Sequence, residues 1–363
     1  MTQLKYKIMS KLIMLLVIII IIIFSFCDNS KYKKLSQIQN NQLKTIKIPL
    51  NYCDVLQTDS IFENIEAICL ETKDECLISD PQKVIVFDNK KIFVQDFDKN
   101  LLIFDINGKF ISKVGKKGRG PGEYIQLAGF DIDSVGNIYI LDYHKILTYN
   151  SDGIFKFSKV LNLSSKEYKI TDSFLPIKHK VMNGFNRFKK YNDIYNIDPT
   201  FGNDTIYSIT KKGLIARYYL DFGKRSLSKI KIPNEFESFS NFKLKLSTSY
   251  SFDTYRFTET NDWLYFIFNF NSKYYNTFYS KKLNKTFTSI LEPDNSGSNK
   301  SFIKWIDTSW GNDLIVLVDP INVIAKLDDV SNLSSIDPNL KIKFKNIKLT
   351  DNPVLFICKM KKY

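Results

Sequence analysis

The chain of 363 residues is long enough to bury one large core or two smaller ones, and its hydrophobic content of 44% and aromatic content of 14% exclude a disordered protein. The formal net charge is +14, but the basic residues are scattered and form no stripe with interleaved aromatic residues, so nucleic-acid binding is not expected. No long stretch has the hydrophobic period of an amphipathic helix, which leaves short strands as the main expected element.

Residues 1–26 have the pattern of an export segment. Three lysines within the first eleven residues precede an unbroken apolar run of 13 residues, Leu12 to Phe24. This run is shorter than the roughly 20 residues of a membrane-spanning helix and suits the apolar part of a secretory signal. Cys27 follows it as the lipidated cysteine follows the signal of bacterial lipoproteins, although Phe26 stands where a small residue is usual. We therefore expect lipidation at Cys27, with an uncleaved N-terminal anchor as the alternative, and a folded part in the cell envelope.

Residues 27–48 are polar and basic, and the sequence predicts a flexible tether between the membrane and the folded domain. The folded domain is then expected to cover residues 49–363. Its position on the periplasmic or the outer-membrane surface is left open.

Two copies of one pattern lie between Lys91 and Tyr149. In each copy an apolar run ends in an aspartate, at Asp96 and at Asp142, and a second apolar run leads to an Asn-Gly or Asp-Gly pair. The runs are too short for helices and rich in β-branched and aromatic residues, and the Gly pairs favour tight hairpin turns. A repeat of about 46 residues made of short strands indicates a β-propeller blade.

The strands are apolar on both faces, which favours packing of neighbouring blades in a closed ring. We expect the ring to close by pairing of the C-terminal strand, Val354 to Met360, with a strand near Ile61 to Leu70. The segment Lys341 to Leu349 is expected to form the strand before the last one.

The run from Phe104 to Tyr124, which contains Gly-Arg-Gly-Pro-Gly-Glu-Tyr, closely resembles the six-bladed β-propeller lipoproteins of Bacteroidetes, which are similar to NHL propellers. Asn203 to Tyr207 and the ending Asp351 to Leu355 match as well. The resemblance implies an all-β fold with a single β-propeller of six four-stranded blades, export and a lipid anchor. It implies no settled activity and no catalytic residues. The polar segment 163–203 departs from the family pattern, so one blade is expected to be reduced and a count of five stays open.

The Gly-rich segment 115–122 offers backbone N–H groups to an anion but lacks the helix and the Lys-Ser/Thr ending of a phosphate loop. The favoured interpretation is a connection between blades in which Gly supplies positive φ. Arg119 and Glu123, which are expected to pair with each other or with a neighbouring blade, remain candidate ligand-binding residues. Asp96 and Asp142 are candidates too, either as carboxylates around a pore or, as we favour, as hydrogen-bond acceptors for the following turns.

Other reactive side chains give weaker signals. His144 and His179 stand in no metal-binding spacing, so no metal site, cofactor or catalytic residue is predicted. Export permits disulfides, but the spacing of Cys53, Cys69 and Cys76 fixes no pair, and Cys358 is predicted to be a small buried hydrophobic residue.

The sequence thus predicts an exported, membrane-anchored binding module with its ligand at one end of the central channel. The ligand class stays open between a glycan, a peptide and a protein partner. One alternative is a propeller hydrolase or lyase with carboxylates lining the channel, although no assembled catalytic set is visible. Another is a scaffold that docks a membrane partner through polar insertions at 224–242 and 328–339.

Overall fold

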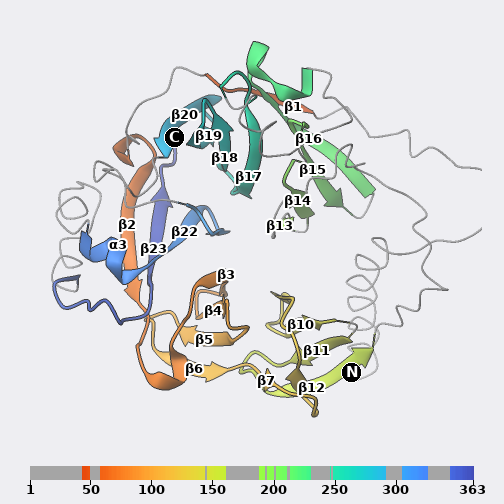
Figure 1. Ribbon diagram of the computed structural model, residues 1–363, viewed down its shortest axis with the longest axis vertical. Helices are drawn as coiled ribbons and strands as arrows, with labels where there is room; N and C mark the ends of the chain where they lie inside the picture. Colours follow the sequence, from red (N-terminus) through yellow and green to blue (C-terminus); the bar gives the residue numbers. More distant parts are fainter. Residues whose placement is uncertain are drawn as a thin grey trace, which may run out of the picture.

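The computed structural model describes residues 43–49, 58–143, 145–160, 188–192, 194–199, 202–210, 213–229, 246, 248–291, 305–325 and 344–363. In this part of the chain the strands form five sheets of four or five strands and one two-stranded sheet. The five larger sheets stand around a common centre (Figure 1). The fold is a single all-β propeller, as the strand repeat predicted. The expected export segment, Cys27 and most of the tether lie outside the described residues.

Four blades are built from strands that follow one another along the chain, with the first strand nearest the centre and the fourth at the rim (Figure 1). Blade 1 comprises β3 (Pro81–Phe87), β4 (Lys91–Asp96), β5 (Leu101–Asp105) and β6 (Phe110–Lys113). Blade 2 comprises β9 (Gly129–Ile132), β10 (Ile138–Asp142), β11 (Lys145–Tyr149) and β12 (Phe155–Val160). Blade 3 comprises β13 (Phe188–Tyr191), β14 (Ile194–Ile197), β15 (Thr205–Thr210) and β16 (Gly213–Asp221). Blade 4 comprises β17 (Phe252–Glu259), β18 (Trp263–Phe270), β19 (Lys273–Ser280) and β20 (Lys285–Leu291).

Blade 5 closes the ring. From the centre outward it contains β21 (Thr308–Trp310), β22 (Asp313–Val318), β23 (Val354–Met360) and β2 (Phe62–Cys69). β2 and β23 pair antiparallel, from Phe62 opposite Met360 to Cys69 opposite Val354. Strands from the two ends of the domain therefore share one sheet, which confirms the predicted closure.

Short elements fill the connections. β7 (Lys116–Lys117) and β8 (Glu123–Tyr124) form a small parallel pair between blades 1 and 2. The others are η2 (Thr58–Ser60), η3 (Asp74–Cys76), η4 (Gly223–Arg225), η5 (Leu227–Lys229) and α3 (Pro320–Ala325). No helix in the described ranges is long and apolar enough to cross a membrane.

The folded domain begins earlier than residue 49. β1 (Lys44–Lys47) pairs parallel with β16 on the rim of blade 3. Ile46 and Ile48 are 1% and 5% exposed. Burial of each such side chain contributes about 1.5–3 kcal/mol to the stability of the fold. Since both residues are buried against the propeller, they belong to it and not to the tether.

Two further segments differ from expectation. The polar segment 163–203, expected to hold a reduced blade, supplies β13 and β14, which complete the four-stranded sheet of blade 3. The described part of the chain therefore contains five complete blades, and residues 161–187 lie outside it. From Phe344 onward, the expected strand 341–349 forms turns instead, because its lysines interrupt the apolar pattern and only Phe344 is buried.

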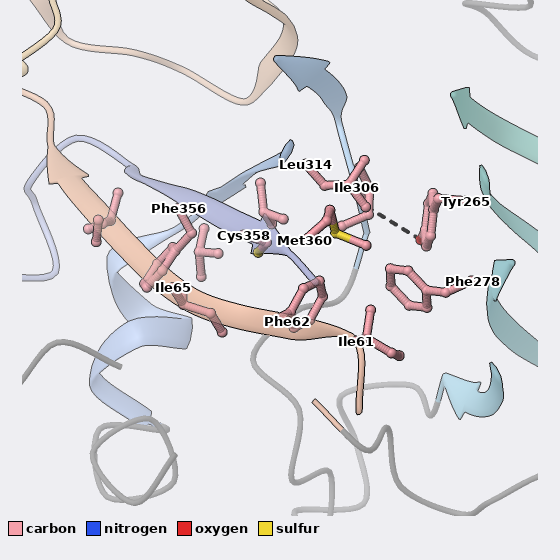
Figure 2. Close-up of a cluster of buried hydrophobic side chains, with 14 of the residues drawn as sticks. Ile61, Phe62, Ile65, Tyr265, Phe278, Ile306, Leu314, Phe356, Cys358 and Met360 are labelled. Carbon is pink, nitrogen blue, oxygen red and sulfur yellow. Dashed lines mark hydrogen bonds between the residues drawn. The ribbon is translucent and has the colours of Figure 1, made fainter. Parts of the chain in front are cut away.

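Apolar clusters fill the space between neighbouring blades. Figure 2 shows the cluster between blades 4 and 5, where Phe62 lies edge-on to Phe278 with ring centroids 5.7 Å apart. Cys358 lies fully buried in the same cluster, as predicted, and its thiol is free. Cys76 is also a free, buried thiol, which donates to the carbonyl oxygen of Glu71 at 3.2 Å. Similar clusters join blades 1 and 2, blades 3 and 4, and blades 5 and 1.

Candidate functional site

The repeated aspartates at the ends of β4 and β10 are buried and engaged with the backbone. Asp96 accepts hydrogen bonds from the Asn100 backbone N–H at 2.7 Å and from its side-chain amide at 2.9 Å. Asp142 accepts from the backbone N–H groups of Ile125 and Gln126 at 3.2 and 2.9 Å. One carboxylate stabilises a hairpin turn and the other holds the connection between blades 1 and 2, so both have a structural role.

The carboxylate of Glu123 lies against the Gly-rich segment, where an external anion was considered. The Glu123 carboxylate accepts a hydrogen bond from the Gly120 N–H at 2.8 Å and forms an ion pair with Lys116 at 3.2 Å. These contacts hold the pKa of Glu123 below its usual value. A Cβ atom added to Gly118 would lie 2.0 Å from Glu123 Oε2, so the carboxylate fills the hollow of the loop. Arg119 is exposed, and within the described ranges it forms no ion pair with Glu123.

A different set of side chains gathers at the centre of the ring. The innermost strand of each blade, or the residue just before it, contributes an ionisable group that is partly accessible. The set consists of Lys83 on β3, Asp131 on β9, Lys189 and Lys190 on β13, Arg256 on β17 and Asp307 before β21. We call it the central cluster.

Hydrogen bonds between blades hold the central cluster together. Lys83 Nζ donates to the Phe130 carbonyl oxygen at 2.5 Å, which joins blade 1 to blade 2. The Tyr195 hydroxyl donates to Asp131 Oδ2 at 2.9 Å, which joins blade 3 to blade 2. Lys189 Nζ reaches the Asp307 carbonyl oxygen of blade 5 at 2.9 Å. Groups of blades 1, 2, 3 and 5 therefore meet at the centre of the ring.

A strained bulge places the guanidinium of Arg256. The register of β17 against β18 shifts on both sides of Tyr255, and Arg256 has a φ of +56°. The Asp198 carboxylate holds this backbone by accepting from the N–H groups of Arg256 and Phe257 at 3.2 and 2.9 Å. Such conformations persist only where the surroundings enforce them, and they concentrate at functional sites. Arg256 in turn pairs with Asp307 at 3.3 Å.

Burial perturbs the ionisation of the central cluster. Burial lowers the pKa of Lys83, although the negative charge of Asp131 acts in the opposite direction. Burial also lowers the pKa of Lys189, although Asp198 and Asp307 act in the opposite direction. Burial raises the pKa of Asp307. Groups with perturbed ionisation that converge on one place are candidates for a functional site.

A second charged network lies between blades 3 and 4 and has a structural character. The Glu259 side chain is 0% exposed and pairs with Arg217 at 2.5 Å and Lys281 at 2.7 Å. The Tyr218 hydroxyl and the Asn196 amide also donate to it, at 2.7 and 2.8 Å. Because the printed contacts of this buried carboxylate come from residues of blades 3 and 4, the network joins these two blades.

No three His, Cys, Asp or Glu residues in the described part of the chain lie together in a way that could hold a metal ion. His144 and His179 lie outside that part. The central cluster was not predicted from the sequence. One available signal was the presence of Lys83 in an otherwise strand-like segment, whereas the polar surroundings of Lys189 and Lys190 gave none.

Residues 156–316 match a family described as a 6-bladed beta-propeller. Over these residues the chain is similar to the six-bladed β-propellers. The match confirms the predicted resemblance to six-bladed β-propellers, over residues that lie beyond the run ending in Tyr124. Residues 43–175 match a second family, described as a domain of unknown function. The described part of this chain has five complete blades.

One solved structure shares the fold, and two others are only weakly similar. A candidate exported protein of Bacteroides fragilis is 20% identical, with a TM-score of 0.62 over 88% of this chain and 100% of the other. The extracellular domain of a candidate one-component system of Bacteroides thetaiotaomicron is 13% identical, with a TM-score of 0.23 over 66% of this chain and 24% of the other. The fission yeast SREBP–SCAP binding domains are 11% identical, with a TM-score of 0.22 over 62% and 52% of the two chains. A comparison with curated proteins finds no match.

Proposed function

We propose that this protein is an exported binding module, held at a membrane, whose ligand sits at the centre of the propeller ring. One observation carries the proposal: the innermost strands of all five described blades bring partly accessible ionisable side chains together there. A rigid ring with convergent polar groups at its centre is a suitable receptor for a small ligand or for an end of a larger one.

Export and anchoring rest on the N-terminal sequence. The apolar run Leu12 to Phe24 and the cysteine after it support secretion and lipidation at Cys27. The structurally similar Bacteroides fragilis protein, itself a candidate exported protein, supports the same location. A glycan, a peptide or a protein of the cell envelope is the class of partner that such a module meets.

A hydrolase or lyase has weaker support at the centre. Among the side chains that the structure describes, the carboxylates of Asp131, Asp198 and Asp307 lie there, and the protein's own N–H and O–H donors hold all three. A general acid or base needs a carboxylate oxygen directed at the substrate. The arrangement therefore favours binding over catalysis.

The test is an array of glycans and peptides probed with the purified full-length chain in detergent micelles. We expect one ligand class to bind and Arg256→Ala to abolish the signal. Lys90→Ala removes a positive charge from an exposed position and is expected to bind as the wild type does. Equal binding by both variants would show that the ligand lies elsewhere. An unchanged unfolding midpoint of Arg256→Ala would confirm that the loss is local.

A further inference from the structure

We infer that the centre of the ring binds an oxyanion, that is, the carboxylate, sulfate or phosphate group of its ligand, with Lys83 and Lys189 as direct donors. The inference rests on the proposed function, because it assigns a chemical class to the ligand of the same site. The evidence is a comparison of the lysine donors of the central cluster with the carboxylates around them.

The ammonium groups have unused donors. A lysine ammonium carries three N–H donors. Lys83 uses one, on the carbonyl oxygen of Phe130, and Lys189 uses one, on the carbonyl oxygen of Asp307. Lys190 makes one long contact, 3.4 Å, to the carbonyl oxygen of Ile132. No carboxylate in the described ranges lies within ion-pair distance of these three lysines.

The acceptors, in contrast, are engaged. Asp131 accepts from the N–H of Ile132 and from the hydroxyl of Tyr195, one bond at each oxygen. Asp198 accepts from two backbone N–H groups of the β17 bulge, again one at each oxygen.

The third carboxylate follows the same rule. Asp307 accepts from the Arg256 guanidinium at one oxygen and from the backbone N–H of Leu317, at 2.7 Å, at the other. All three carboxylates thus have a protein donor on both oxygens, whereas each of the three lysines uses one N–H donor on a carbonyl oxygen and pairs with no carboxylate in the described ranges, so the unpaired charge at the centre is positive. An oxyanion offers only acceptors and a negative charge, and it complements such a surface.

The ammonium groups of Lys83 and Lys189 are largely buried and lie near other cations. Burial disfavours the charged forms of Lys83 and Lys189, and Lys190 repels the first while Arg256 and Lys83 repel the second, although Asp131 acts on Lys83, and Asp198 and Asp307 on Lys189, in the opposite direction. Both lysines keep part of their surface accessible. An oxyanion between them would neutralise this repulsion at the moment of binding, in the same way that opposite charges stabilise one another in a partly desolvated site. A neutral ligand would leave the repulsion unchanged.

A purely structural role for the lysines makes a different prediction. The inner strands leave backbone carbonyl groups unpaired at their central edges, and lysine side chains are a common means of covering such edges. Lys83→Gln and Lys189→Gln keep a donor for the carbonyl oxygen while removing the charge. If the lysines only cover these edges, the wild-type protein binds no oxyanion, and neither substitution changes that result.

The experiment is a binding titration of the full-length chain in micelles with galacturonate, sulfate and inorganic phosphate at constant ionic strength. Glucose is the neutral probe and chloride the reference anion. We expect at least one of the three oxyanions to bind and glucose not to. The double variant Lys83→Gln/Lys189→Gln is expected to lose about tenfold or more in affinity for each charge-assisted hydrogen bond removed.

The matched control is Lys90→Gln/Lys282→Gln, which removes the same two charges from exposed positions and is expected to bind as the wild type does. Lys189→Arg keeps the charge and the N–H donors and is expected to retain binding. Retained binding would show that a substitution at this position does not by itself disrupt the fold. The inference is overturned if none of the oxyanions binds or if the double variant and its control bind equally. If the array ligand is lost in Arg256→Ala but bound normally by the double variant, the ring centre remains the site and only its anion specificity is wrong.

Discussion

Lys189 donates a hydrogen bond at 2.9 Å to the main-chain oxygen of Asp307, which lies 118 residues further along the chain. The two residues belong to blades 3 and 5, between which blade 4 stands in the ring (Figure 1). Their contact shows how closely the inner strands approach one another at the axis. It also means that a ligand bound there would touch several blades at once.

The bulge in β17 depends on Asp198. Asp198→Ala removes both acceptors for the backbone N–H groups of Arg256 and Phe257 and leaves a left-handed residue without support. We expect a loss of about 1–3 kcal/mol in the free energy of unfolding, measured with urea. Asp98→Ala, at an exposed turn position, is expected to change it by less than about 0.5 kcal/mol. Equal values for the two variants would mean that Asp198 does not hold the bulge.

Glu259 should control stability in acid. Burial by itself would raise the pKa of this carboxyl, but Arg217 and Lys281 bring it below its usual value of 4.5. Since the folded protein binds this proton more weakly than the unfolded chain, the stabilisation is complete above pH 4.5 and is lost as the pH falls through the lower, folded pKa.

Glu259→Gln tests this assignment. The substitution leaves Arg217 and Lys281 without their anionic partner, and we expect it to lower the free energy of unfolding by about 3 kcal/mol at neutral pH. This value is in the lower part of the range for buried ion pairs because both cations are partly exposed. Urea unfolding of wild type and variant should converge as the pH falls below 4.5. A difference that stays constant into acid would contradict the assignment.

Lys189 should have the opposite pH behaviour. Its pKa in the fold lies below the usual 10.5, so the charged form is penalised by folding. Stability should therefore rise as the pH increases from the folded pKa towards 10.5, where the unfolded chain also loses the proton. Lys189→Gln removes the penalty, so its unfolding midpoint should exceed that of the wild type at neutral pH, with the gain vanishing in alkali. A lower midpoint at neutral pH would argue for a structural lysine.

Two glycines of the sequence repeat offer a matched comparison. Gly108 and Gly153 occupy equivalent hairpin turns with φ of +86° and +82°. A Cβ at Gly108 would lie 2.2 Å from the backbone oxygen of Cys69, whereas at Gly153 the nearest atom is a methyl group of Val114 at 3.3 Å.

Backbone strain at positive φ should lower the free energy of unfolding by about 1–2 kcal/mol in both alanine variants. Gly108→Ala should cost about 1–3 kcal/mol more, because the backbone of the neighbouring blade cannot move aside. Denaturant unfolding measures both values. Equal losses would show that the contact between blades 5 and 1 yields more readily than we infer.

The parts of the fold that repeat were predictable. Asp96 and Asp142 end equivalent strands, and the turns at Gly108 and Gly153 follow at nearly the same spacing, so local chemistry alone indicated the blades. The pairing of β2 with β23 followed from the need to close a ring of sheets that are apolar on both faces.

The parts that depend on distant partners were not predictable. β13 is polar because its lysines reach carbonyl groups of blades 2 and 5, so its sequence lacks an apolar strand pattern. β1 is a strand only because β16, far along the chain, offers it an edge. The bulge at Arg256 is held by Asp198, 58 residues earlier, and no local motif marks it.

The most direct test of a ligand site at the ring centre is lysine footprinting by mass spectrometry, with and without the ligand that the array selects. Reaction with an amine-specific reagent reports the accessibility of each lysine in the same sample. We predict that the ligand protects Lys83 and Lys189 while exposed Lys90 and Lys282 react as before. Unchanged reactivity of Lys83 and Lys189 at saturating ligand would place the binding site elsewhere on the propeller.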